Sequence, residues 1–139
     1  MRLLWTKSNK IGSKVIRWGM DEDCSHFAIA FMDDCCEHSL VVESRGSQGV
    51  HPTWMKTFLE RNEVVHSIEV PLPDEEEHEM YRLVVERTGG KKYDHKAMMF
   101  WVYRAFLRKF FGVKLPKENK WGDRNQFYCV EILSVLRDE

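Results

Sequence analysis

The sequence predicts one α+β domain, with a few strands and with helices before, between and after them. Two observations predict this class. Short apolar runs of strand length alternate with longer segments whose apolar residues recur at helical spacing. The chain has 139 residues, 43% of them hydrophobic, which is enough for one sizeable core. We therefore expect residues 1–139 to form a single domain with a small antiparallel sheet and packed helices.

The first third of the chain predicts a helix followed by a hairpin. Apolar residues recur at roughly helical spacing in residues 11–19, and Gly19 ends the run. The segments HFAIAFM (26–32) and SLVVES (39–44) are typical of strands. The polar segment 33–38 between them indicates a turn, so the two strands are expected to pair.

The middle of the chain predicts a loop, a short helix and a strand. The glycine-bearing loop RGSQGV follows the hairpin, and residues 52–62 indicate a short helix with Pro52 near its first turn. Residues 64–73 are typical of a strand that ends at prolines.

The remainder of the chain predicts three helices. Residues 73–90 have acids at the start and glycines at the end, which suits the helix dipole. Residues 90–113 turn at Tyr93 into a strongly apolar helix, and the polar loop 115–126 follows it. Residues 127–139 predict a last helix with an apolar face that includes its third residue, a cysteine.

Charge and hydropathy limit the class of protein. The net charge of −1 gives no indication of a nucleic-acid partner. The first residues form too short an apolar run for a secretory signal, and no stretch approaches a transmembrane span. We expect a soluble, cytoplasmic protein whose four cysteines are reduced. No cofactor is indicated.

Two residues are candidates for nucleophilic chemistry. Cys129 stands at the expected first turn of the last helix, and helix N-termini favour the thiolate form of cysteine. His26 opens a strand directly after a polar turn, where its ring can face a cleft. A thiol and a histidine can serve as nucleophile and general base. Each position alone is also compatible with ordinary packing or hydrogen bonding.

The hairpin favours Glu43 as the group that orients His26. If two residues face each other across an antiparallel hairpin, the turn lies midway between them. Pairing His26 with Glu43 puts the midpoint between Asp34 and Cys35, inside the polar turn. Pairing with His38 puts it inside the apolar run, although His38 stays open as an alternative.

Several weak motifs occur in one order along the chain: IGSKVIRWG, CSHFAIAF, VVES, GVHPTWMKTFLERN, GGKKYD and FYCVEIL. In this order they resemble the circularly permuted papain-like cysteine amidases, the YiiX-like group of the NlpC-type superfamily. The resemblance runs from about Ile11 to Leu136. It implies a permuted papain-like fold in which the histidine precedes the cysteine. Val130 departs from the family, which often has serine there, and the hairpin turn is longer than usual.

The resemblance implies a cysteine hydrolase, an amidase or peptidase, with Cys129 as nucleophile, His26 as base and Glu43 as orienting residue. Backbone amides near Cys129 would stabilise the oxyanion, with Gln126, Tyr128 or Trp121 as possible further donors. Tyr93 and Trp121 could line a substrate groove or belong to the core. Peptidoglycan-type peptides, other amides and lipid esters all fit this chemistry, and a phage or bacterial source would suit the compact domain.

Three rival interpretations of the sequence exist. Zinc is disfavoured because the pairs Cys24/His26 and Cys36/His38 lie roughly 20 Å apart along the predicted hairpin, at ~3.3 Å per residue. A lipid-directed acyltransferase or esterase of the same superfamily remains an alternative, because the apolar, basic segment around residues 98–111 could lie in a membrane interface. A non-catalytic binding module on the same fold is the third.

Overall fold

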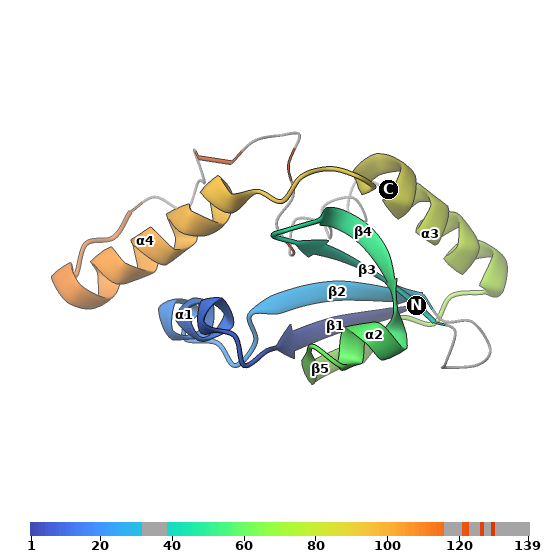
Figure 1. Cartoon of the computed structure of the whole chain (residues 1–139), viewed down its shortest axis with the longest axis horizontal. Helices are drawn as coiled ribbons and strands as arrows, with labels where there is room; N and C mark the ends of the chain where they lie inside the picture. Colours follow the sequence, from blue (N-terminus) through green and yellow to red (C-terminus); the bar gives the residue numbers. More distant parts are fainter. Residues whose placement is uncertain (32–38, 116–120, 123–125, 127–128, 130–139) are drawn as a thin grey trace.

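The computed structural model describes residues 1–31, 39–115, 121, 122, 126 and 129. These residues form an α+β arrangement around one five-stranded antiparallel sheet (Figure 1). The strand order is β4-β3-β2-β1-β5, which places β1 between β2 and β5. The strands are β1 Arg2–Lys7, β2 His26–Phe31, β3 Leu40–Arg45, β4 Gly49–Trp54 and β5 Glu63–Glu69.

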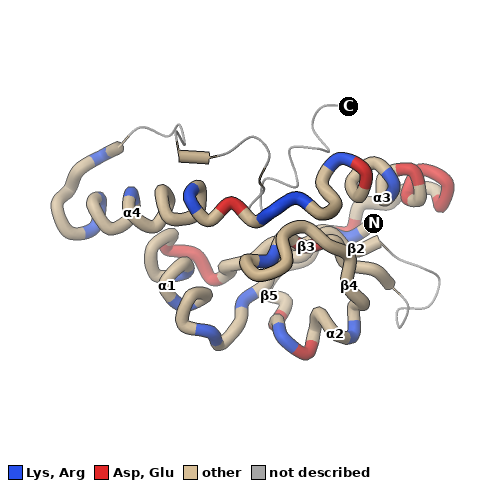
Figure 2. The backbone as a smooth tube through the Cα atoms, turned by 45° about the horizontal axis from the view of Figure 1, so that its top comes forward, with Lys and Arg blue, Asp and Glu red and all other residues tan. Residues whose placement is uncertain are grey.

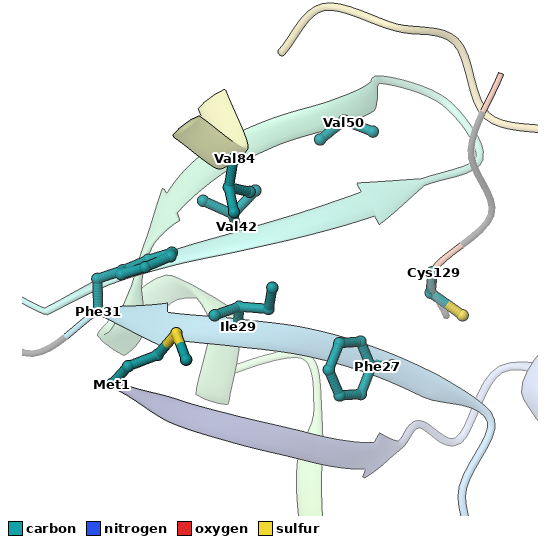
Figure 3. Close-up of a cluster of buried hydrophobic side chains, with 8 residues drawn as sticks. All are labelled: Met1, Phe27, Ile29, Phe31, Val42, Val50, Val84 and Cys129. Atoms are coloured by element: carbon teal, nitrogen blue, oxygen red, sulfur yellow. The ribbon is translucent and has the colours of Figure 1, made fainter. Parts of the chain in front are cut away.

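Each face of the sheet buries its own apolar cluster, because successive residues of a strand point to opposite faces. On one face, Phe27, Ile29 and Phe31 of β2 pack with Val42 and Val84 (Figure 3). On the other face, the alternate β2 residues and Val41 pack against Phe58, which is fully buried. The sheet is therefore covered on both sides, by α3 Asp74–Thr88 and by α2 Met55–Leu59.

Helices α1 Ile11–Met20 and α4 His95–Phe111 pack against each other beyond one end of the sheet (Figure 1). Asp21 joins them, since its carboxylate accepts hydrogen bonds from Arg108 at 3.0 Å and Lys109 at 2.6 Å. None of the described helices is long and apolar enough to cross a membrane.

The ends of the two long helices follow ordinary capping rules. The side chain of Asp94 caps α4 by accepting from the Ala97 amide at 2.7 Å, and Gly112 ends this helix with a φ of 66°. Acidic residues gather in the first turn of α3, where they suit the helix dipole (Figure 2). One of them, Glu77, also binds the N-terminal ammonium group.

The structure confirms the hairpin strands, the strand after residue 63 and the helices expected near 11–19, 73–90 and 90–113. It corrects two expectations. The N-terminal residues form β1, which the sequence analysis did not assign. Pro52 lies in β4 and not in a helix, and α2 begins only at Met55. An edge strand such as β4 tolerates proline, because it need not donate on its open side.

Other expectations fall largely outside the described residues. They are the hairpin turn at 33–38, most of the loop at 115–126 and the last helix at 127–139.

The packing of α2 on the sheet predicts a large effect for one substitution. Phe58→Ala should lower the free energy of unfolding by about 3–5 kcal/mol, because the buried ring leaves a cavity against β2 and β3. Urea unfolding measures this. The neighbouring Leu59, which is 47% exposed, provides the control. If Leu59→Ala proves as costly as Phe58→Ala, α2 does not pack as described.

Candidate functional site

His26 and Glu43 come together across the β2–β3 pair. His26 Nε2 lies 2.9 Å from Glu43 Oε2. Glu43 pairs directly with Ala28, so it reaches His26 diagonally. The predicted register, with Glu43 directly opposite His26, was wrong by two residues. A shift of two leaves both side chains on the same face, which is why the contact survives the error.

Glu43 is a buried carboxylate with three partners. Its side chain is 2% exposed, and its second oxygen, Oε1, accepts a hydrogen bond from Arg61 Nη2 at 2.9 Å. His51 Nε2 lies 3.8 Å from the same oxygen. Burial opposes ionisation, but the hydrogen bond with His26 and the nearby Arg61 and His51 hold the pKa of Glu43 below its usual range. This carboxylate is therefore ionised at neutral pH.

The ring of His26 bridges Glu43 and Cys129. The side chain of Cys129 interacts with the ring of His26, which also makes the hydrogen bond with Glu43. Burial alone would lower the pKa of His26, but the interactions with Cys129 and Glu43 outweigh it and raise the pKa to about 9. The imidazole is therefore cationic at neutral pH.

Cys129 lies at the end of the apolar cluster beyond Phe27 and is 7% exposed (Figure 3). A chain of backbone contacts leads to it from the sheet. The Val50 amide in β4 donates to Lys91 at 2.8 Å, and Lys92 pairs with Gln126 in a parallel bridge. This bridge places Gln126, three residues before Cys129 in the sequence, beside Lys92.

Gly49 allows the first of these contacts. It has a φ of 72°, and a Cβ atom there would lie 2.1 Å from the Lys91 carbonyl oxygen. Only glycine fits this close backbone approach.

A cavity of about 730 Å³ opens beside the Cys129–His26 pair, and both residues line it. Tyr93, one of the two predicted substrate-binding residues, also lines this cavity. Trp121, the other, is not among its described lining residues. Its ring stacks on Tyr103 and contacts Phe100 of α4, because the apolar face of that helix offers it aromatic partners. The structure thus brings Tyr93 to the candidate site, whereas Trp121 packs against the side chains of α4.

Other residues proposed from the sequence have different places. Gln126 lies in the bridge with Lys92, whereas Tyr128 and the alternative orienting residue His38 fall outside the described residues. Within the described part of the chain, no group of three His, Cys, Asp or Glu side chains could hold a metal ion. The Cys36/His38 pair lies outside that part.

Sequence reasoning missed Arg61 and His51 as partners of Glu43. His51 pairs directly with Glu43 in the β3–β4 register, so recognition of β4 as a strand would have placed it there. Arg61 follows α2, and its Nε donates to the Thr57 carbonyl at 3.1 Å, which holds the guanidinium toward the sheet. No sequence motif marks that contact.

No protein-family model and no curated protein matches this sequence. The permuted papain-like relationship therefore stays a prediction that depends on the motifs and their order.

The His26–Glu43 contact predicts a pH dependence. His26 should titrate at about 9, and Glu43→Gln should lower this value because the amide offers no charge to the imidazolium. Since the folded pKa exceeds the ordinary 6.5, the contribution of His26 to stability is full below pH 6.5 and disappears as the pH rises through about 9.

NMR titration of the imidazole measures the pKa, and urea unfolding at several pH values measures the stability. A His26 that titrates near 6.5 in the wild-type protein would contradict the described contacts.

The Arg61–Glu43 pair predicts a stability effect. Arg61→Gln should lower the free energy of unfolding by about 1–3 kcal/mol, because Glu43 stays buried and loses a charged hydrogen-bond donor. Arg2→Gln is the matched control, since Arg2 forms an exposed pair with Glu69 at 3.8 Å that is worth about 0–1 kcal/mol. Equal losses in the two variants would show that Arg61 does not support Glu43.

Proposed function

We propose that this protein is a cysteine hydrolase that cleaves amide or ester bonds by acyl transfer through Cys129, His26 and Glu43. The observation that carries the proposal is the placement of His26. Its partly buried ring interacts with a thiol and a carboxylate, and the thiol and the ring line a common cavity. Nucleophile, base and orienting group are the parts that such catalysis needs.

The contacts suggest a role for each group in two half-reactions. The thiolate of Cys129 attacks the substrate carbonyl carbon, forming a C–S bond while the carbonyl electrons move to oxygen. The adduct collapses, the bond to the amine or alcohol breaks, and that leaving group takes a proton from His26. Water then attacks the thioester and gives a proton to His26. The C–S bond breaks, which releases the acid and restores the thiolate.

Glu43 would hold the imidazole with one nitrogen toward Cys129 and stabilise its cationic form. A cationic imidazole beside a thiol favours the thiolate, which is the nucleophilic form. Arg61 would act one step further away, by fixing the carboxylate through its other oxygen.

A packing role for Cys129 is the simplest alternative, because the residue is buried beside an apolar cluster. The neighbours of the sulfur argue against it. A thiol that only packs needs apolar contacts, whereas burying the His26–Glu43 pair beside it carries a large desolvation cost. An arrangement that accepts this cost is typical of a functional site.

The motif order supports a permuted papain-like fold as part of the same proposal, since the base comes from an early strand and the thiol from near the C-terminus. Peptide-like amides are the substrates that the resemblance favours.

The proposal predicts selective alkylation. Iodoacetamide at neutral pH should modify Cys129 faster than Cys24, although Cys24 is the more exposed of the two. Burial and the nearby Glu22 raise the pKa of the Cys24 thiol, which lowers its reactivity. His26→Ala should slow the labelling of Cys129 by at least about tenfold, because the imidazolium is lost. Mass spectrometry of the labelled peptides measures both rates.

His38→Ala is the control for the orienting residue. It should leave the labelling of Cys129 unchanged, whereas Glu43→Gln should slow it. Inert Cys129, or fast labelling that does not depend on His26, would refute the proposed nucleophile. Loss of labelling in His38→Ala alone would assign the orienting role to His38.

A further inference from the structure

The cavity beside Cys129 has mostly apolar walls. Its described lining includes Trp5, Ile16, Phe27, Trp101 and Val102. Among the described lining residues, Glu22 is the only Asp, Glu, Lys or Arg. The volume of about 730 Å³ lies within the range of about 300–1,000 Å³ of small-molecule sites. Such walls suit an apolar group.

A second cavity, of about 390 Å³, adjoins the first, shares His26 and four other lining residues with it, and has a different character. Lys10, Arg45 and Arg61 line it, and Glu43 is the one carboxylate among its described lining residues. His26 lines both cavities, whereas Cys129 lines only the first. The cavity that contains the thiol therefore has a mostly apolar lining, and the second cavity has a mostly cationic set of charged residues.

The chemistry of acyl transfer assigns the two halves of a substrate to these cavities. The acyl carbon binds the sulfur, so the acyl group occupies the cavity that contains Cys129. The leaving group takes its proton from His26 and extends into the second cavity, which His26 lines and Cys129 does not. We infer, on the basis of the proposed function, that the substrate joins an apolar acyl chain to a polar leaving group with a negative charge, as in an N-acyl amino acid.

The implied reaction is balanced with water as the only co-reactant. The amide C–N bond breaks, the amine nitrogen gains a proton from His26, and water supplies the hydroxyl of the released fatty acid. The amino-acid carboxylate takes no part in bond cleavage. It contributes through attraction to the cationic side chains, which salt weakens.

Binding to a Cys129→Ala variant tests the apolar half without relying on turnover. Calorimetry would compare acetylglycine, hexanoylglycine and decanoylglycine. Each added methylene should tighten binding by about fourfold until the cavity is filled. Affinities that do not change with chain length would overturn the apolar cavity as the acyl site.

A matched pair of variants on β5 tests where the chain binds. Ile68 lines the apolar cavity and is 53% exposed, whereas Val64 lies on the same strand, is 36% exposed and does not line it. In the Cys129→Ala background, Ile68→Asp should weaken decanoylglycine binding at least tenfold, and Val64→Asp should leave it unchanged. Equal effects would place the chain elsewhere.

The charged half is tested by comparing decanoylglycine with decanoylglycinamide, which lacks the carboxylate. The acid should bind the Cys129→Ala protein at least about tenfold more tightly at low salt, and Arg45→Gln should reduce this preference. Equal affinities for acid and amide would overturn the assignment of the cationic cavity.

Turnover of decanoylglycine by the wild-type protein then separates the two proposals. If binding depends on chain length but no turnover occurs, the proposed hydrolase activity is refuted and the proposed ligand class is supported. If turnover needs Cys129 but does not depend on chain length, the proposed hydrolase activity is supported and the proposed ligand class is refuted.

Discussion

The buried carboxylate of Glu43 is the group on which the rest of the site depends. A charge in this position is stable only when it is paired and fully hydrogen-bonded. Its partners come from separate elements: His26 begins β2, His51 lies in β4, and Arg61 follows α2. The β2–β3 register, the β3–β4 register and the packing of α2 must all be correct for the carboxylate to be satisfied. The same contact fixes the ring of His26, so folding and the alignment of the proposed base have one physical cause.

Cys129 reaches this ring by an independent route. The segment after α3 joins the beginning of β4 through Lys91, and Lys92 in turn pairs with Gln126 near the C-terminus. His26 and Glu43 are thus built into the sheet, whereas Cys129 comes from near the C-terminal end of the chain. Gly49 permits the close backbone approach to Lys91 with which this route begins.

Local patterns in the sequence predicted the local parts of this structure. Short apolar runs predicted β2 and β3, and the midpoint of the polar turn between them paired His26 with Glu43. The register was wrong by two residues, which leaves both side chains on one face. The six residues of β1 were considered only as a possible secretory signal, so the strand was not predicted. Pro52 suggested the start of a helix, whereas it lies in the edge strand β4. The support of Glu43 by Arg61 depends on how α2 packs, and the meeting of Cys129 with His26 joins residues far apart in sequence. No local pattern encodes either contact, and only the motif order suggested the second.

The charged groups around Glu43 explain why a proton on His26 matters. Glu43 is negative, Arg61 is positive, and His26 is positive up to a pH of about 9. Glu43 therefore has two cationic hydrogen-bond partners in a largely buried volume. If His26 loses its proton, Glu43 keeps the hydrogen bond from Arg61 but loses the imidazolium as a charged partner. The low dielectric of the interior makes that state costly. The interactions that raise the pKa of His26 therefore also keep the imidazole cationic beside Glu43, which is the state that the proposed acyl transfer requires.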